Sequence, residues 1–298
     1  MNFPSSGVDA PFWLPPLVAL VISFFTSMGG VSGAFLLLPF QVSYLGYTAP
    51  SVSATNQLFN VVAIPSGVYR YIREGRMMWP LTLAIVAGTL PGVFIGAWIR
   101  IVHLADPRHF KLFTGLVLLY IGLRLLRDGV KKSGRSGIED APTGSFVVKR
   151  KPGFSIKRIE FDFAGETVSF SPATVLALSF AVGIVGGIYG IGGGAIIAPV
   201  LVAFLALPVY TVAGAALMGT FVTSVAGLGF YQLLALRFTG QNVAPDWLLG
   251  LLFGAGGFVG MYLGARCQRY VPSRAIDLLL CGCILFVALR YAVGFFSG

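Results

Sequence analysis

Two glycine-rich interruptions in long apolar runs are the parts of this sequence best suited to bind a ligand. The first runs from Met28 to Pro39 and the second from Ile188 to Pro199. A helix that restarts after such a break presents backbone N–H groups and the positive end of its dipole, which together attract an anion. Because glycine has no Cβ, the backbone can turn tightly there and a ligand can approach it closely. The chemistry available is therefore anion binding by backbone amides.

The two interruptions match each other at a constant spacing of 160 residues. Three pairs of residues align at this spacing: Gly30 with Gly190, Gly33 with Gly193, and Pro39 with Pro199. Matching breaks in the two halves of a chain are typical of transporters built from internal repeats, in which the breaks face one substrate site. We therefore expect the two breaks to form a single site.

Polar side chains in the segment after each break are candidates to line the same site. The first half carries four at helical spacing: Ser53, Asn56, Gln57 and Asn60. The second half carries a weaker counterpart: Thr220, Thr223 and Ser224. A polar stripe in an apolar helix either holds helices together by hydrogen bonds or lines a substrate pathway. The sequence alone leaves both interpretations open.

Other chemistry has little support in the apolar runs. No Asp or Glu lies at the centre of a run, so no proton relay is evident, and no Ser/His or Asp/His arrangement suggests catalysis. The three cysteines, Cys267, Cys281 and Cys283, fit neither a zinc site nor a redox pair. His103 and His109 lie together in a loop, where a surface role is expected. We expect no enzyme activity, no cofactor and no metal.

Composition places the chain in the membrane. It is 56% hydrophobic and 11% charged, with a mean hydropathy of +0.84, which is too apolar for a soluble domain. The net charge of +10 does not indicate nucleic acid, because the basic residues sit at the ends of apolar runs and in one polar insert. We expect an all-α polytopic membrane protein whose partners are the lipid bilayer and a small anion, with a homo-oligomer left open.

The apolar runs indicate about eight transmembrane segments in two four-segment repeats, 11–127 and 172–296. The first repeat contains Pro11–Phe40, Thr48–Val68, Pro80–Ile101 and Phe110–Leu126; the second contains Pro172–Leu205, Val209–Leu236, Trp247–Ala265 and Ala275–Phe296. Thirty helical residues would reach about 45 Å, against a hydrocarbon core of roughly 30 Å. Each opening segment is therefore expected to be a glycine-broken or re-entrant helix. The repeats also match at Gly92-x-x-x-Gly96 and Gly260-x-x-x-Gly264, a pattern typical of close helix packing.

The region between the repeats, 128–171, is a polar insert. Apolar residues alternate through Ile156, Ile159, Phe161 and Phe163 to a turn at Ala164–Glu166 and return through Val168 and Phe170, a pattern that predicts a short β-hairpin. Lys and Arg are concentrated on the loops of one side. The positive-inside rule then predicts that the insert and both termini are cytoplasmic.

The motif Gly190-x-Gly192-Gly193-Gly194 with Pro199, followed by Gly214–Thr220, resembles the TauE/SafE sulfite-exporter family of membrane permeases. The resemblance covers nearly the whole chain apart from the insert. It implies secondary transport of sulfite, an organosulfonate or a related anion across the bacterial inner membrane. The first break departs from the motif, with Ser32 and Ala34 where the second has Gly192 and Gly194. The two breaks are therefore expected to contribute unequally.

We expect a secondary permease that binds a small anion between the breaks near mid-membrane. The substrate-binding residues expected are Gly30, Gly33, Pro39, Asn56, Gln57, Asn60, Gly190, Gly192, Gly193, Gly194, Pro199, Thr220, Thr223 and Ser224. A passive anion channel remains an alternative, and an intramembrane enzyme acting on a lipid phosphate is a weaker one.

Overall fold

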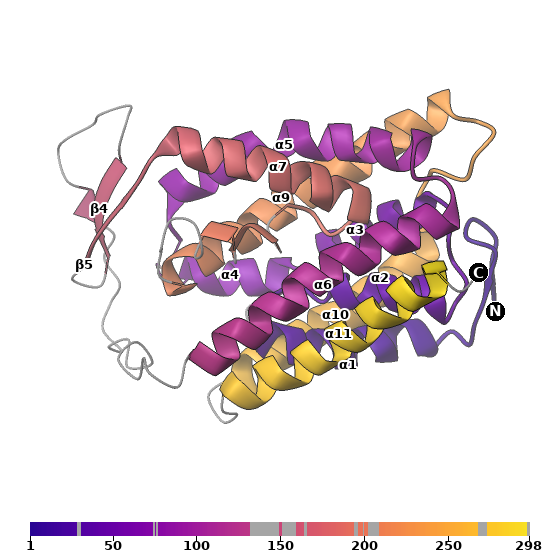
Figure 1. Cartoon of the computed structure of the whole chain (residues 1–298), viewed down its shortest axis with the longest axis horizontal. Coiled ribbons are helices and arrows are strands. Elements are labelled where there is room, and N and C mark those ends of the chain that lie inside the picture. The colour runs from indigo at the N-terminus through magenta and orange to yellow at the C-terminus, as the bar shows by residue number, and fades with distance from the viewer. Residues whose placement is uncertain are drawn as a thin grey trace.

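The computed structural model describes residues 1–28, 31–73, 75, 77–131, 149–150, 159–163, 166–193, 196–198, 200–201, 209–267 and 273–296. Most of these residues are helical, and the helices run roughly along the long axis of the molecule (Figure 1). Their apolar composition and length agree with a multi-pass membrane protein.

Among the described residues, four helices are long and apolar enough to cross a membrane: α5 (Trp79–Val102), α7 (Pro172–Tyr189), α9 (Val209–Arg237) and α10 (Trp247–Cys267). Even the 18 residues of α7 reach about 27 Å at 1.5 Å per residue. The remaining helices are α1 (Leu14–Met28), α2 (Ala34–Ser43), α3 (Ser51–Ala63), α4 (Pro65–Arg73), α6 (Pro107–Lys131) and α11 (Ser273–Phe296).

Both opening segments turn back on themselves at the glycine breaks. A Cβ on Gly33, just before α2, would lie 2.9 Å from the Ser23 hydroxyl oxygen in the middle of α1. In a continuous helix these two residues would be about 15 Å apart along the axis. In the second segment, a Cβ on Gly186 of α7 would lie 2.7 Å from the carbonyl oxygen of Gly192. Each opening segment therefore turns back at its break. Span length predicts a glycine-broken or a re-entrant helix, and we call this turned-back form a re-entrant segment.

The two halves pack against each other reciprocally: α1 lies along α10, and α7 lies along α5. Three glycines spaced four apart make each contact, Gly256, Gly260 and Gly264 on α10 and Gly88, Gly92 and Gly96 on α5. On α10 they face the carbonyl groups of Pro16, Leu20 and Phe24; on α5 they face those of Leu176, Phe180 and Ile184. Any side chain at these glycines would collide with backbone, so the glycine pattern serves helix packing.

The other helices complete the bundle. α6 and α11 pack antiparallel, with Gly115 against Tyr291 and Gly122 against Leu285. α3 and α9 contact each other, and each also contacts one helix of the reciprocal pairs, α3 with α10 and α9 with α5. The polar stripe of α3 is thereby enclosed by helices: Ser53, Asn56, Gln57 and Asn60 are fully buried.

The chain termini and the insert lie at opposite ends of the bundle (Figure 1). At the end that holds the termini, called here the terminal end, the His109 ring near the start of α6 contacts Phe295 near the end of α11. Ser6, in the turn between β1 (Asn2–Phe3) and β2 (Val8–Asp9), donates hydrogen bonds to Asp246 at the start of α10. Phe3 and Val8 of this N-terminal hairpin are buried.

At the other end, called here the insert end, β4 (Ile159–Phe163) pairs antiparallel with β5 (Glu166–Phe170), and β3 (Lys149–Arg150) pairs with β4. For helices that cross a membrane along the bundle axis, the two ends face opposite sides. The expectation that the insert and both termini share the cytoplasmic side does not fit that arrangement. It counted each opening segment as a crossing, whereas each one turns back.

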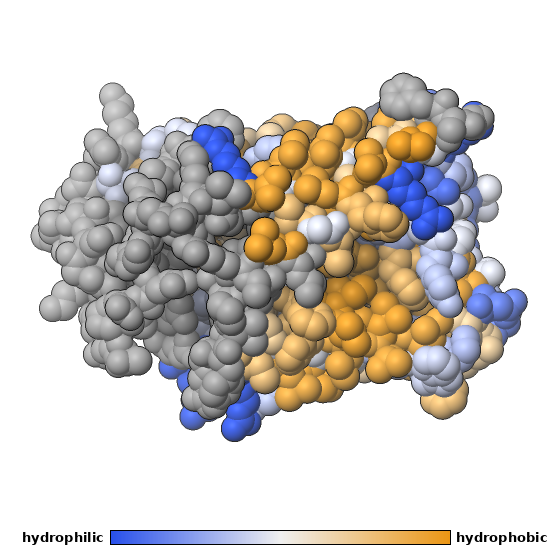
Figure 2. Space-filling view, turned by 60° about the horizontal axis from the view of Figure 1, so that its bottom comes forward, coloured by the Kyte–Doolittle hydropathy of each residue, from blue (hydrophilic) through white to orange (hydrophobic). Residues whose placement is uncertain are grey.

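The surface has a membrane-like distribution of hydropathy. Apolar residues cover the middle of the bundle, and hydrophilic residues gather at the terminal end (Figure 2). Large apolar side chains such as Leu83, Phe94, Leu233 and Phe286 are exposed on the surface of the bundle. Lipid chains are the natural environment for such a belt.

Candidate functional site

One buried side chain, Asn60 of α3, connects the two glycine breaks. Its carbonyl Oδ1 accepts a hydrogen bond from the Ser32 hydroxyl of the first break, at 2.6 Å. Its amide Nδ2 donates to the carbonyl oxygen of Ile191 in the second break, at 3.0 Å, and to the Ser224 hydroxyl of α9, at 3.3 Å. Asn60 therefore bridges both re-entrant segments and α9 at one fully buried point.

Ser53 and Gly190 bring α3 against the second break. The Ser53 hydroxyl donates to the carbonyl of Ile188, at 2.9 Å. Gly190 has a φ of +80°, and a Cβ there would lie 2.6 Å from the Cα of Ser53. Both the left-handed backbone and the contact with α3 require glycine at this position.

Hydroxyls of α9 contact two further glycines of the second break, Gly192 and Gly193. A Cβ on Gly192, which has a φ of +66°, would lie 2.8 Å from the Ser224 hydroxyl and 3.0 Å from the carbonyl of Thr220. The backbone N–H of Gly193 donates to the Thr223 hydroxyl, at 3.3 Å. That hydroxyl in turn donates to the carbonyl of Gly219, at 2.6 Å. A protein hydroxyl thus holds the amide at which a helical turn restarts.

The first break is held differently. The N–H of Ala34 donates to the Ser32 hydroxyl within the break, at 3.3 Å, rather than to a neighbouring helix. The amide of Asn56 donates to the carbonyl of Ala34, at 3.0 Å, and accepts a hydrogen bond from the Gln41 amide, at 3.3 Å. In the first break the hydroxyl is supplied by Ser32, whereas in the second, where Gly192 replaces it, α9 supplies the hydroxyls. The two breaks are thus held by hydroxyls from different elements.

We call these residues the Asn60 cluster: Ser32, Gly33, Ala34, Ser53, Asn56, Asn60, Gly190, Ile191, Gly192, Gly193, Thr220, Thr223 and Ser224. None of them carries a formal charge. Attraction for an anion in this cluster comes from amide and hydroxyl dipoles and from the helix starts.

Gln57 adds unused hydrogen-bonding capacity beside the cluster. It is fully buried, and neither its amide nitrogen nor its carbonyl oxygen has a partner among the described residues. Its Cδ would lie 2.7 Å from a Cβ on Gly227, so the side chain rests against the backbone of α9. A buried amide without partners costs on the order of 1–3 kcal/mol. Such a group is suited to a polar ligand.

Not every residue expected at the site belongs to the cluster. Pro39 is buried within α2, and its carbonyl accepts a hydrogen bond from the Tyr291 hydroxyl at 3.4 Å, more than one turn beyond the break. Gly30, Gly194 and Pro199 lie outside the described residues. The contacts add Ser32 to the site. The sequence signal that could have identified Ser32 is its alignment with Gly192. Ser32 supplies in the first break a hydroxyl that α9 supplies in the second.

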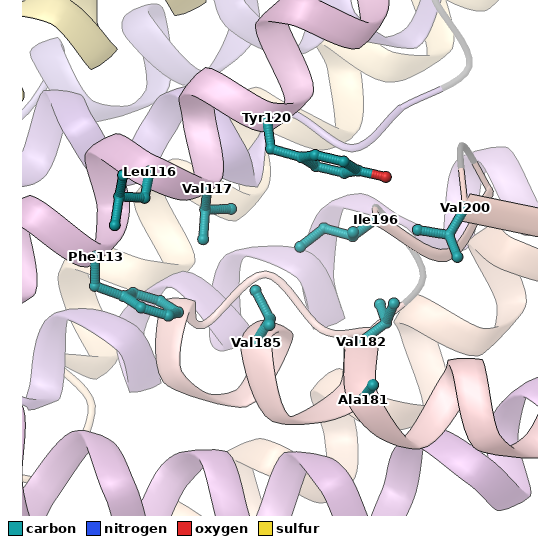
Figure 3. A pocket seen from close by; sticks show the side chains of 9 residues that line it. All are labelled: Phe113, Leu116, Val117, Tyr120, Ala181, Val182, Val185, Ile196 and Val200. Carbon is teal, nitrogen blue, oxygen red and sulfur yellow. The ribbon is translucent and has the colours of Figure 1, made fainter. Parts of the chain in front are cut away.

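A separate groove lies between α6, α7 and residues 196–200, with a volume of about 390 Å³. Its lining is apolar apart from the hydroxyl of Tyr120: Phe113, Leu116, Val117, Tyr120, Ala181, Val182, Val185, Ile196 and Val200 (Figure 3). With no charge and a single hydroxyl, the groove suits hydrocarbon rather than a small anion.

Comparison with known proteins places this architecture in a family. The model of the sulfite exporter TauE/SafE family matches residues 16–291. The chain is 25% identical to the probable membrane transporter protein YunE of Bacillus subtilis over 89% of its own length and 91% of the relative's. It is 22% identical to a probable membrane transporter protein of Xylella fastidiosa strain 9a5c, over 91% and 92% of the two lengths. No solved structure matches the chain significantly.

The family match spans both re-entrant segments and every helix of the Asn60 cluster. The relatives that match the chain along most of its length carry transporter names. The chain therefore belongs to the sulfite exporter TauE/SafE family and is a membrane transporter.

Proposed function

We propose that the chain is a secondary permease for a small oxyanion, such as sulfite or an organosulfonate, which binds at the Asn60 cluster near mid-membrane. The observation that carries this proposal is the position of Asn60, whose side chain hydrogen-bonds to both glycine breaks and to α9. A ligand bound there would contact both re-entrant segments at once. Such a site can couple binding to movement of one half against the other.

Binding would exchange protein hydroxyls for the oxygens of the anion. The N–H of Ala34 now donates to Ser32, and the N–H of Gly193 to Thr223. Charge-assisted hydrogen bonds are roughly twice as strong as neutral ones, so an oxyanion competes well for both amides. The released hydroxyls can rotate and donate to the same anion. Because the cluster is uncharged, the anion can also leave without breaking an ion pair.

We also propose that residues 11–127 and 172–296 are two repeats of one unit with inverted orientation, joined by the insert at 128–171. Reciprocal packing supports this: the opening helix of each half lies along α10 or α5, the third segment of the other half. One re-entrant segment would then enter from the terminal end and the other from the insert end. The six crossings would be α3 with α4, α5, α6, α9, α10 and α11.

Charge supports an orientation for this topology. Five basic residues lie toward the terminal end: Arg100, Arg108, Lys111, Arg237 and Arg290. Nine others among the described residues lie toward the insert end: Arg70, Arg73, Arg124, Arg127, Lys131, Lys149, Arg150, Arg266 and Arg274. By the positive-inside rule the insert end is cytoplasmic and the termini face the opposite side of the bacterial inner membrane.

Flux into proteoliposomes tests the permease. Wild-type protein should move sulfite and small sulfonates with saturable kinetics, and anion on the opposite side should accelerate the exchange. Asn60→Ala removes the three hydrogen bonds of the bridge and should lower the flux at least tenfold. Gln241→Ala, a change at an exposed amide near the terminal end, should leave it unchanged.

Three results would contradict the proposal. Equal flux of every anion in wild type and Asn60→Ala would place the site elsewhere. A linear, unsaturable flux without acceleration by exchange would favour the channel, and turnover of a lipid phosphate without anion flux would favour the enzyme.

A further inference from the structure

An arginine is buried at the terminal end of the bundle, apart from the Asn60 cluster. Arg100, near the end of α5, has 0% exposure and forms no ion pair within the described part of the chain. Its Nη2 donates to the carbonyls of Thr48, at 2.9 Å, and Ala49, at 3.3 Å, and its Nη1 donates to the carbonyl of Leu104. Its Nε has no hydrogen-bond partner in the part of the chain that the structure describes, and the guanidinium carbon lies 3.7 Å from the centre of the Phe110 ring.

This environment leaves the positive charge of Arg100 without a counter-ion. Carbonyl dipoles and a ring face stabilise a cation only in part, and a buried charge is otherwise paired or bound to a ligand. Asp246 is the buried carboxylate at this end, but its two oxygens accept hydrogen bonds from the N–H of Leu249 and from Ser6. Its charge is thus held at the start of α10.

Neutral donors surround the same region. The Tyr47 hydroxyl lies 3.0 Å from the Thr55 hydroxyl, and burial raises the pKa of Tyr47, so the phenol stays protonated at neutral pH. The Ser51 hydroxyl is fully buried beside Tyr47, whose pKa it lowers against the stronger effect of burial. Arg100 and Asp246 both act electrostatically on Tyr47, with opposite effects on its pKa.

The polar stripe of α3 connects this end with the Asn60 cluster. Ser51 is the first residue of α3, and Ser53, Asn56 and Asn60 follow it along the helix, all fully buried. The rise of a helix places Asn60 about 14 Å beyond Ser51 along the axis. Buried polar side chains therefore lead from the surroundings of Arg100 to the centre of the bundle.

From this arrangement we infer that Arg100 is an anion-binding residue at the terminal-end mouth of the transport path, where it holds the same small oxyanions before or after the Asn60 cluster. The inference rests on the proposed function. The anion takes the guanidinium hydrogens now donated to Thr48 and Ala49, together with that of Nε, in the forked geometry that suits arginine and oxyanions. The end of the bundle where the termini lie is thereby one opening of the path.

A cysteine at position 51 reports on this mouth. Ser51→Cys is introduced into a chain whose Cys267, Cys281 and Cys283 are replaced by serine, and its labelling is followed with two reagents. One is the anionic 2-sulfonatoethyl methanethiosulfonate and the other the cationic 2-(trimethylammonium)ethyl methanethiosulfonate. With Arg100 present, the anionic reagent should react faster, and methanesulfonate should slow the labelling.

Substitutions at Arg100 decide the outcome. Arg100→Gln should lower the ratio of anionic to cationic labelling rates at least tenfold, whereas Arg290→Gln, which removes an exposed charge near the same end, should not. Arg100→Lys keeps the positive charge but loses the forked N–H donors of the guanidinium. The methanesulfonate concentration that halves the labelling rate should therefore rise at least threefold. This second comparison decides the matter if Arg100→Gln does not fold.

An unchanged ratio in Arg100→Gln, an unchanged half-protecting concentration in Arg100→Lys, or no labelling by either reagent would overturn the inference. Flux by the unsubstituted protein separates the two proposals. Absence of anion flux counts against the permease, whereas flux with labelling that ignores Arg100 counts against this mouth alone.

Discussion

Gly190→Ala tests whether the close contact between the second break and α3 requires glycine, which has no side chain, at position 190. Gly190 has a φ of +80°, and its Cβ position lies 2.6 Å from the Cα of Ser53. The left-handed backbone costs alanine about 1 kcal/mol. Overpacking against a backbone atom adds roughly 1–3 kcal/mol, because Ser53 and its helix must move. The expected loss in free energy of unfolding is therefore about 2–4 kcal/mol.

Gly46→Ala is the matched control. Gly46 has a φ of +68°, and nothing lies within 4 Å of its Cβ position, so alanine there carries the backbone cost alone. Thermal unfolding in detergent should show a decrease in Tm for Gly190→Ala that exceeds that of Gly46→Ala by about 2–12 °C, at 2–4 °C per kcal/mol. Sulfite flux should fall only in Gly190→Ala. Equal decreases in Tm for the two variants would refute the steric argument.

Three further predictions follow from the packing and the topology. Gly260→Leu places a side chain against the carbonyl of Leu20 and should separate α1 from α10, which lowers Tm strongly. Gly282→Leu is the control, because nothing lies within 4 Å of the Cβ position of Gly282, and it should have little effect. Similar decreases in Tm for the two variants would contradict the close packing. Tyr189→Phe removes a hydrogen bond of 2.7 Å to the carbonyl of Phe35. It should lower the free energy of unfolding by about 1 kcal/mol, which the shift in Tm measures. No shift in Tm would mean that another group replaces this hydrogen bond. Alkaline phosphatase fused after residue 298 should be active, and green fluorescent protein inserted at 138 should fluoresce; the opposite pattern would reverse the proposed orientation.

Much of the fold follows from local properties of the sequence. Apolar runs and the scarcity of central charges indicate membrane helices, because desolvation decides that outcome residue by residue. The excessive length of the opening segments predicts that each is a broken or a re-entrant helix. The glycines at intervals of four predict close helix packing, although their partners, α7 for α5 and α1 for α10, come only from the tertiary arrangement.

The orientation expected from the sequence differs from the proposed one for a definite reason. Apolar composition does not distinguish a segment that crosses the bilayer from one that turns back, since both place apolar residues within the membrane. Each misassigned segment reverses the side given to everything after it. The contact of Gly33 with Ser23 resolves this, because it shows the chain returning beside the helix it has just left.

The candidate site divides in the same way. By itself the sequence determined where the breaks fall, that they match at a spacing of 160 residues, and that a polar stripe follows the first. Only the tertiary structure decided which groups meet: Asn60 reaches Ser32 across 28 residues of sequence and Ile191 across 131, while Pro39 lies elsewhere. Hydrogen bonds act over about 3 Å, so they depend on how helices pack, whereas hydropathy is a sum over each segment and can be read from the sequence.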